Sequence, residues 1–288
     1  MKIVCLKGGL GNQMFEYCRF RDLMDSGNGK VYLFYDRRRL KQHDGLRLSD
    51  CFELELPSCP WGIRLVVWGL KICRAVGVLK RLYDDEKPDA VLIDDYSQHR
   101  RFIPNARRYF SFRLFLAELQ SGFVQMIRAV DYPVSVHVRR GDYLHPSNSS
   151  FVLCGVDYFR QAIAYVRKKR PDARFFFFSD DMEWVRENLW MEDAVYVEHT
   201  ELMPDYVDLY LMTLCRGHII SNSTFSFWGG IFGRRRQRYE NLSSSVVPRP
   251  DMDQSAYFFG GVGRVIGYKI RPREFPFGIS RGRVHYVE

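Results

Sequence analysis

Runs of apolar residues alternate with amphipathic segments along most of the chain, a pattern typical of α/β proteins. In the N-terminal half, apolar runs predict strands at residues 2–6, 31–35 and 90–93. A glycine-rich turn at residues 7–13 joins the first strand to a helix predicted from about residue 12 to residue 24. The order of strand, glycine turn, helix and strand is typical of a nucleotide-binding unit.

The C-terminal half alternates strand and helix more regularly. Strands are predicted at 134–138, 175–178, 194–197, 218–221 and 245–247, and helices at about 157–169, 182–189, 205–215 and 225–232. This alternation predicts a doubly wound parallel sheet. Residues 131–133 interrupt the helical spacing of residues 105–129 and mark a boundary. We therefore predict two domains, 1–130 and 131–250, and an unassigned extension, 251–288.

Composition narrows the class of protein. With 288 residues, of which 46% are hydrophobic, the chain can bury two cores. The most apolar stretch, residues 61–82, is interrupted by Arg64, Lys71, Arg74 and Lys80, which predicts an amphipathic helix or helix pair and no membrane span. The N-terminus is typical neither of a signal peptide nor of an anchor. Seven scattered cysteines without a C-x-x-C pair indicate reduced thiols in a cytosolic protein, with no zinc site.

The formal net charge of +9 calls for an explanation. No nucleic-acid-binding motif accompanies the basic clusters, so nucleic acid is not a predicted partner. Three explanations remain open. An anionic membrane surface or a phosphorylated substrate would each use the charge. The third explanation is a basic surface that is merely solvated.

The strand at 134–138 ends in charged side chains: His137, Arg139, Arg140 and Asp142. Two arginines directly after a buried strand favour an anionic ligand. Phosphate is the leading candidate, because a guanidinium group binds it through two parallel hydrogen bonds. A surface turn held by salt bridges is the alternative.

Two further polar clusters, at residues 179–181 and 221–224, follow later strands. The carboxyl ends of parallel strands share one edge of the sheet, so we expect all three clusters to meet there. Each of the two could instead simply cap the following helix. Together the three favour a nucleotide site, with arginines for phosphates, acids for ribose or base groups, and a helix N-terminus for a phosphate oxygen. The sequence has no Walker lysine loop.

The glycine turn only partly fits a dinucleotide fingerprint. Gly9 and Gly11 have the first spacing, but the third glycine would fall at Met14. A nicotinamide cofactor is therefore the second choice for this turn. Its bare backbone can still approach a ligand closely, with Asn12 and Gln13 as side-chain donors.

Four motifs together resemble the α-1,2-fucosyltransferases of glycosyltransferase family 11: GGLGNQMFEY at 8–17, HVRRGDY at 137–143, FSDD at 178–181 and SNSTFSFW at 221–228. The resemblance implies a GT-B-like fold, with two Rossmann-like domains whose parallel sheets face across a cleft. It implies that the C-terminal domain holds GDP-fucose and that the N-terminal domain receives the acceptor. It also implies an inverting transfer to the 2-hydroxyl of a galactose-type residue, with no metal or other cofactor.

The resemblance also implies roles for single residues. Arg139 is expected to bind the diphosphate and stabilise GDP as it leaves, since charge develops there as the glycosidic bond breaks. His137 is expected to contact the nucleotide or phosphate, and Asp180 or Asp181 to reach ribose or guanine. The residues expected to offer hydroxyl and backbone N–H groups to the phosphates are Asn222, Ser223, Thr224 and Phe225.

From the glycine loop, Asn12 is expected to touch fucose or the β-phosphate as part of the catalytic set. The other loop residues assigned to substrate binding are Gly9, Gly11 and Gln13. Arg140 and Asp142 either bind substrate or pair with each other to fix their turn. Asp142 is the candidate general base, although a dissociative reaction path needs little help from a base. Glu16 is not chosen, because the family often has glutamine there.

Parts of the chain depart from the family pattern. Residues 95–98 differ from the usual Gly-Tyr-aromatic-Gln segment, and residues 249–288 match poorly. The D-x-D sequence at 251–253 lies outside the nucleotide cluster and is interpreted as chance. These differences bear on the acceptor more than on the donor.

We therefore interpret the chain as a cytosolic bacterial α-1,2-fucosyltransferase that acts on a surface glycan or oligosaccharide. If the acceptor is lipid-linked, the enzyme is expected to lie peripherally at the inner face of the membrane. The alternatives are another nucleotide-sugar-dependent glycosyltransferase and a non-catalytic nucleotide- or glycan-binding protein.

Overall fold

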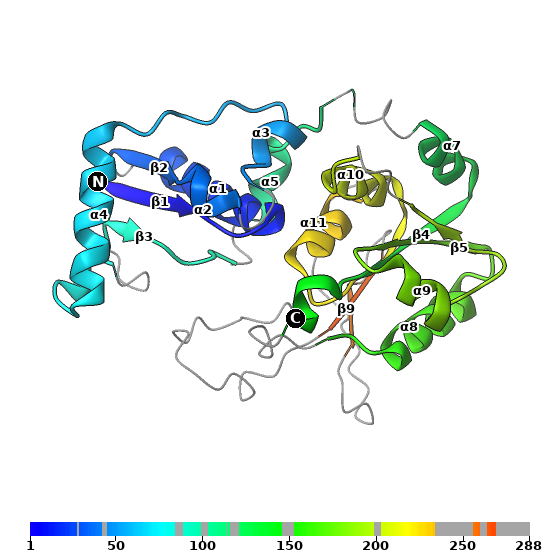
Figure 1. Cartoon of the computed structure of the whole chain (residues 1–288). Helices are drawn as coiled ribbons and strands as arrows, with labels where there is room; N and C mark the ends of the chain where they lie inside the picture. Colours follow the sequence, from blue (N-terminus) through cyan, green and yellow to red (C-terminus); the bar gives the residue numbers. More distant parts are fainter. Residues whose placement is uncertain are drawn as a thin grey trace. The chain divides into compact units, whose positions relative to one another are not determined.

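The chain divides into two compact units, Met1–Arg113 and Leu114–Glu288 (Figure 1). The computed structural model describes residues 1–27, 29–41, 45–83, 89–98, 103–113, 115, 121–145, 153–198, 203–233, 256–259 and 264–268. The division falls earlier than the predicted boundary after residue 130. The difference arises because helix α7 (Ser121–Ala129) packs against helix α10 (Tyr206–Leu214) of the second unit.

The first unit contains a parallel sheet with the strand order β2-β1-β3. Its elements are β1 (Lys2–Leu6), α1 (Leu10–Asp25), β2 (Val31–Tyr35), α2 (Arg37–Leu40), α3 (Leu48–Cys51), α4 (Trp61–Ala75), the 3-10 helix η2 (Lys80–Leu82), β3 (Leu92–Ile93) and α5 (Ile103–Tyr109). The predicted strands and the helix after the glycine turn are confirmed. Val4 pairs with Leu33 of β2 and with Ile93 of β3, so β1 is the central strand.

The predicted helix pair at 61–82 is confirmed as α4 and η2. Ile63, Val67 and Leu70 of α4 pack in a core cluster that includes Ile3 and Cys5 of β1. Figure 1 shows α4, in cyan, beside β1 and β3. Within the described part of the chain, no helix combines the length and the apolar character that crossing a membrane requires.

The second unit contains a sheet with the strand order β6-β5-β4-β7-β9-β8. Its elements are α7, β4 (Tyr132–Val138), the 3-10 helix η4 (Gly141–Leu144), α8 (Val156–Lys169), β5 (Ala173–Ser179), α9 (Met182–Asn188), β6 (Val195–Tyr196), α10, β7 (Gly217–Ile219), α11 (Thr224–Phe232), β8 (Ala256–Phe259) and β9 (Arg264–Tyr268). The predicted alternation from β4 to α11 is confirmed, and these strands are parallel. The strand predicted at 245–247 lies outside the described residues. The extension that the sequence left unassigned supplies β9, parallel to β7, and the antiparallel edge strand β8.

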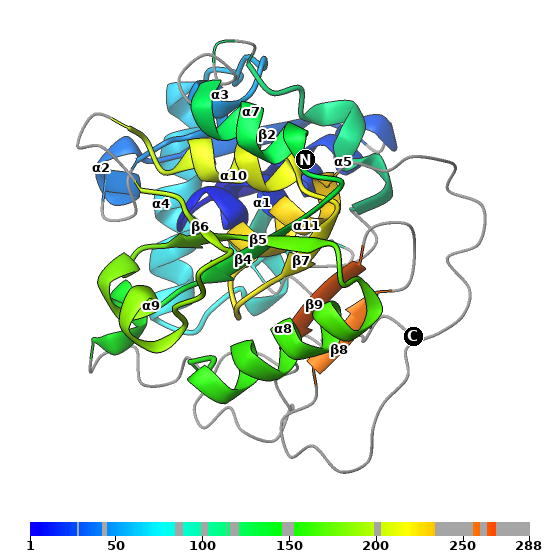
Figure 2. The same ribbon diagram turned by 90° about the vertical axis from the view of Figure 1, so that its right-hand side faces the viewer.

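Both faces of the central strand β4 are covered. Val134, Val136 and Val138 pack with α8 and α9 in one core cluster. Ser135 and His137 point the other way, because side chains alternate along a strand. Figure 2 shows α8 and α9 on one side of this sheet and α10 and α11 on the other. Because helices cover both faces of β4, polar side chains that need access to solvent or ligand lie at the end of the strand.

Candidate functional site at the carboxyl ends of β5, β4 and β7

The three predicted polar clusters follow three adjacent strands, in the order β5-β4-β7. From β4 the chain proceeds outward through β5 and β6, and then returns to the other side of β4 to form β7. The gap between β4 and β7 is therefore a topological switch point, the place where open α/β sheets bind ligands. The predicted convergence of the clusters at one edge is confirmed for these strands.

Arg139 leaves the end of β4 and lies between two carboxylates. Its Nε donates a hydrogen bond to Asp142 Oδ1 at 3.0 Å, and its Nη1 lies 3.1 Å from Asp180 Oδ2. About a third of the Arg139 side chain remains exposed. The guanidinium group is thus held in place at the strand end and stays accessible to a ligand.

Arg140 takes partners different from those of Arg139. Its Nε donates to Asp181 Oδ2 at 3.0 Å, and its guanidinium carbon lies 3.9 Å from the centre of the Trp184 ring. The possible pairing of Arg140 with Asp142 is not what the structure shows, because Asp142 pairs with Arg139. Arg140 instead ties the strand end to α9. No motif in the sequence indicates that Trp184 takes part in this arrangement.

Asp180, which follows β5, connects the end of β5 to the end of β4 through its side chain. Its Oδ1 accepts a hydrogen bond from the Arg140 backbone N–H at 2.9 Å, while Oδ2 faces Arg139. A Cβ atom at Gly141 would lie 2.7 Å from Asp180 Oδ2, so the absent side chain of this glycine makes room for the contact. Asp181 caps α9 by accepting from the Trp184 N–H at 3.2 Å. The alternative interpretation as a helix cap is therefore correct for Asp181, which also pairs with Arg140.

His137 is buried next to the third cluster. Its Nδ1 lies 2.9 Å from Ser221 Oγ, and its ring lies 5.7 Å from the ring of Phe225. Burial, together with the positive charge of Arg139, lowers the pKa of His137 to about 3. The imidazole is therefore neutral near neutral pH, where it can position a neighbour by hydrogen bonding but cannot supply a positive charge to a phosphate.

The turn at 221–224 is shaped by hydrogen bonds from outside the predicted set. Tyr143 Oη donates to the Asn222 carbonyl at 2.7 Å, and Ser226 Oγ donates to the Ser223 carbonyl at 3.1 Å. Burial raises the pKa of Tyr143 to about 12, so its hydroxyl remains a donor. Ser223 is the N-cap residue of α11, with extended backbone, and Thr224 begins the helix. Tyr143 and Ser226 lie within the quoted motifs, but their roles depend on tertiary contacts.

In the first unit, the glycine loop is organised around Gly8 and Asn12. Gly8 has φ +67°, and a Cβ there would meet Asn12 Nδ2 at 2.8 Å. Asn12 Oδ1 accepts a hydrogen bond from Gln98 Nε2 at 2.9 Å. Gly9 precedes α1, and a Cβ there would meet nothing within 4 Å, whereas Gly11 is buried in the first turn. The substrate roles predicted for this loop remain predictions.

Gln13 is fully buried, and its side chain joins two loops of the first unit. Its Nε2 donates to the Gly8 carbonyl at 2.9 Å and to the Gly45 carbonyl at 2.8 Å. Its Oε1 accepts from the Arg47 N–H at 3.1 Å. Both amide hydrogens are thereby used inside the unit, so the structure assigns Gln13 to holding the glycine loop.

Glu16 lies in α1, contacts the start of the glycine loop at Lys7, and is fully buried. Its Oε2 accepts a hydrogen bond from the Lys7 N–H at 2.8 Å, while Oε1 has no hydrogen-bond partner within the described residues. Burial raises the pKa of the Glu16 carboxyl well above its ordinary value, and the nearby charges of Asp95 and Asp94 act in the same direction. Glu16 therefore keeps its proton to a higher pH than an exposed glutamate does.

Replacing Glu16 by glutamine is expected to stabilise the protein increasingly as the pH rises from about 5 to about 8. The unfolded chain loses the Glu16 proton near pH 4.5, whereas the folded chain retains it. The wild type therefore loses stability as the pH rises toward the folded-state pKa, and the Glu16→Gln protein has no such proton to lose. Thermal unfolding across this pH range tests the prediction, with the exposed Glu187→Gln as control. A Glu16→Gln advantage that stays constant or shrinks with pH would contradict it.

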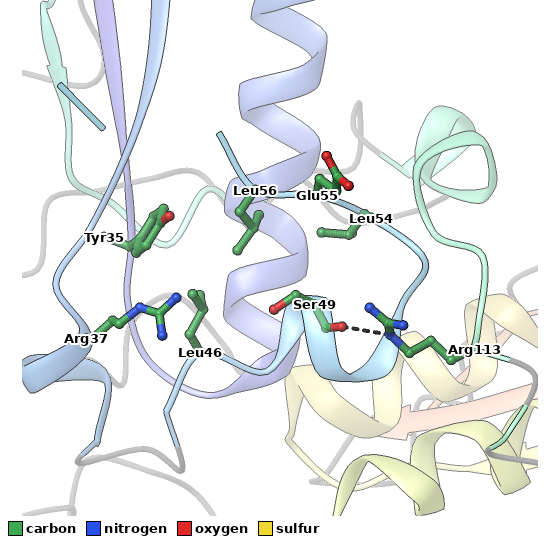
Figure 3. Close-up of a pocket in the computed structure, with 8 residues that line it drawn as sticks. All are labelled: Tyr35, Arg37, Leu46, Ser49, Leu54, Glu55, Leu56 and Arg113. Carbon is green, nitrogen blue, oxygen red and sulfur yellow. Dashed lines mark hydrogen bonds between the residues drawn. The ribbon is translucent and has the colours of Figure 1, made fainter. Parts of the chain in front are cut away.

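A separate pocket of about 390 Å³ lies in the first unit (Figure 3). It is lined by Tyr35, Arg37, Leu46, Ser49, Leu54, Glu55, Leu56 and Arg113. Arg113 Nε donates to the Ser49 carbonyl at 2.8 Å at one end, and Tyr35 and Arg37 lie at the other, as Figure 3 shows. The lining combines one aromatic ring, charged groups and leucines. None of these residues was predicted as a site residue, and six of the eight come from residues 37–60, where the sequence shows no clear periodicity.

Among the described residues, no group of three or more His, Cys, Asp or Glu side chains is arranged to hold a metal ion. The D-x-D sequence at 251–253 lies outside those residues.

Comparisons with known proteins agree on one family and one fold. Residues 109–239 match the sequence profile described as Glycosyl transferase family 11, a range that contains the whole β5-β4-β7 edge. The Escherichia coli alpha-1,2-colitosyltransferase is 28% identical over 270 residues, which cover 85% of this chain and 90% of that protein. The galactoside alpha-(1,2)-fucosyltransferase 1 of Plecturocebus brunneus is 34% identical over 114 residues, 37% of this chain and 31% of that protein.

A solved structure shares the fold. The crystal structure of NodZ alpha-1,6-fucosyltransferase soaked with GDP-fucose matches with a TM-score of 0.52 at 13% sequence identity, over 80% of this chain and 91% of that chain. At this identity the match shows the architecture alone, an α/β fold with parallel sheets.

Proposed function

The chain belongs to glycosyl transferase family 11, and we propose that it transfers fucose from GDP-fucose to the 2-hydroxyl of a galactose-type residue, with inversion at the anomeric carbon. The observation that carries the proposal is the position of Arg139 at the switch point, held between Asp142 and Asp180. The α-1,2 linkage is supported by the names of two relatives that differ in the sugar they transfer.

Donor binding would require Arg139 to exchange partners. Arg139 and Arg140 together face three carboxylates, those of Asp142, Asp180 and Asp181. A diphosphate carries more negative charge than a single carboxylate and can accept two parallel hydrogen bonds from a guanidinium group. We infer that the diphosphate takes over Arg139, and that Asp180 then becomes free to accept a hydrogen bond from a ribose hydroxyl or from guanine.

Departure of GDP is the step that these residues would assist. As the bond between the fucose anomeric carbon and the phosphate oxygen breaks, negative charge grows on the β-phosphate. Arg139 would stabilise this charge. His137, neutral and hydrogen-bonded to Ser221, would position the turn whose Ser223 and Thr224 offer hydroxyl and N–H groups.

The first unit is proposed to bind the acceptor sugar. We propose a GT-B arrangement in which the first unit faces the donor site across a cleft, with Asn12 reaching fucose or the β-phosphate. Asp142 is the proposed general base for the acceptor hydroxyl. The acceptor is proposed to be a surface glycan or oligosaccharide, with a lipid-linked precursor as one form. The pocket at Tyr35 and Glu55 supports sugar contact in this unit, because it combines a ring with charged groups.

Colitose is a second candidate for the transferred sugar, because a relative whose match covers 85% of this chain is a colitosyltransferase. A donor assay separates the two sugars. GDP-fucose and GDP-colitose are each supplied with a panel of galactose-terminated oligosaccharides, released GDP is measured, and the product linkage is determined. The proposal predicts faster GDP release from GDP-fucose and an α-1,2-linked product.

The same assay can reject the proposal. A different linkage, or transfer only from a uridine or adenosine donor, would show another glycosyltransferase activity. GDP binding without transfer or donor hydrolysis would indicate a non-catalytic binding protein.

A further inference from the structure

Helix α4 of the first unit is apolar on two opposite faces. Its inner face, Ile63, Val67 and Leu70, packs in the core. Its outer face consists of residues spaced four, three and four positions apart, which places them on one stripe of a helix. They are Trp61, Leu65, Trp68 and Ile72, with exposed fractions of 77, 57, 67 and 43%.

The apolar surface continues beyond the helix end. Val76, Val78 and Leu79 are 65, 50 and 58% exposed, and Leu79 has the left-handed backbone conformation, with φ 54°. Contiguous exposed apolar surface of this kind normally contacts another surface. We call Trp61, Leu65, Trp68, Ile72, Val76, Val78 and Leu79 the α4 patch.

The segment that carries the α4 patch, residues 61–83, is basic. Residues 61–83 contain five basic side chains and no Asp or Glu. The five are Arg64, Lys71, Arg74, Lys80 and Arg81. Lys71 and Arg74 lie 3.4 and 3.6 Å from Asp94, and Arg81 pairs with Asp89, so three of the five charges have a partner within the unit. Arg64 and Lys80 are exposed beside the apolar stripe and the turn that follows it.

We propose that the α4 patch docks on an anionic lipid bilayer. Tryptophan rings favour the membrane interface, where the ring is buried and the indole N–H is hydrated. Leucine, isoleucine and valine side chains enter the acyl boundary, while lysine and arginine contact anionic headgroups. The patch combines these three kinds of side chain on one helix and the turn that follows it.

The charge also disfavours a second copy of the chain as the occupant. A two-fold dimer would place the same patch against itself, so the basic side chains of one copy would face those of the other. An anionic bilayer carries the complementary charge. The proposal does not depend on the identity of the sugar donor, since docking needs no turnover.

The test is co-flotation of the full chain with vesicles. We expect the wild type to bind vesicles of phosphatidylglycerol and phosphatidylethanolamine, to bind much more weakly to pure phosphatidylcholine, and to be released in part by salt. Replacing Trp61 and Trp68 together by serine is expected to lower the partition coefficient by about tenfold or more. The matched control is Trp190→Ser, because Trp190 is an exposed tryptophan of the second unit, 63% exposed, and its loss should leave binding unchanged.

A charge pair of variants tests the headgroup contact. Arg64→Glu combined with Lys80→Glu should lower binding to anionic vesicles, whereas Lys168→Glu on α8 should not. Unchanged melting temperatures and unchanged GDP binding in solution would show that the variants fold and keep the nucleotide site. Absence of vesicle binding by the wild type, or binding unaffected by the double tryptophan change, would overturn the proposal. Sedimentation that shows a dimer abolished by the same change would assign the patch to a second copy and would likewise overturn it.

Discussion

Replacing Arg139 by alanine is expected to lower kcat/KM for GDP-fucose by about 10²- to 10³-fold, the usual effect of losing one donor that stabilises charge in the transition state. The physical reason is the position of the guanidinium group, accessible at the switch point and held by Asp142 and Asp180. The melting temperature should change little, because half-exposed ion pairs contribute only about 0–1 kcal/mol to folding. Steady-state kinetics and thermal unfolding on the same preparation measure both effects.

The matched control for Arg139 is Arg167→Ala. Arg167 also pairs with a carboxylate, Asp193 at 2.5 Å, and also lies in the second unit, but this pair is on the surface at α8. Its loss should leave kcat/KM within about twofold of the wild type, as expected for a surface pair. An Arg139→Ala enzyme with wild-type kinetics would remove the basis for the proposed donor site.

Replacing the next residue, Arg140, by alanine is expected to lower the stability of the protein more than its kcat/KM. The change removes the contact with the Trp184 ring and leaves Asp181, a partly buried carboxylate, without its cation. Loss of such a stacked and hydrogen-bonded pair costs about 1–3 kcal/mol of folding free energy. The melting temperature should therefore fall by several degrees, at about 2–4 °C per kcal/mol for a chain of this size. Below that transition, kcat/KM should fall less than about tenfold, since Arg140 acts through the turn.

The control for Arg140 is Arg186→Ala. Arg186 also pairs with a carboxylate, Glu198, and also lies over a ring, that of Tyr196 at 4.8 Å, but its pair is far more exposed. Its loss should cost less than about 1 kcal/mol. Arg140→Lys should not restore stability, because an ammonium group cannot both stack on the ring and donate from a planar fork. If Arg140→Ala instead lost activity as strongly as Arg139→Ala with no loss of stability, the scaffolding role would be wrong.

The strands and the site edge could be predicted because their causes are local. Val134, Val136 and Val138 alternate with Ser135 and His137, and this alternation already marks a strand. The carboxyl ends of parallel strands all lie at one edge of the sheet. Polar clusters that follow these strands therefore meet there, and the order of strands and helices is enough to predict it.

The partners of each charged side chain could not be predicted in the same way. Arg139 and Arg140 are adjacent in the sequence, but one faces Asp142 and Asp180 while the other stacks on Trp184. Which carboxylate each arginine meets depends on the backbone turn after β4, which no periodicity encodes. The same holds for Gln13, because no local pattern indicates that its side-chain amide donates to the Gly8 and Gly45 carbonyls.

The edge of the second sheet was missed for a different reason. Strands β8 and β9 lie in a stretch where glycine, proline and aromatic residues are mixed, so their apolar runs are short. The pairing of β9 with β7 is a contact between distant parts of the sequence, and the local pattern carries no information about it.

The most direct measurement of the central claim is calorimetric binding of GDP and GMP to the wild type and to Arg139→Ala. The two ligands differ by the β-phosphate, so the four affinities form a cycle that isolates its contact with Arg139. We expect the wild type to bind GDP more tightly than GMP, and Arg139→Ala to remove most of this preference, a coupling of about 1.5–3 kcal/mol. Equal weakening of GDP and GMP by Arg139→Ala would contradict the claim that Arg139 binds the diphosphate.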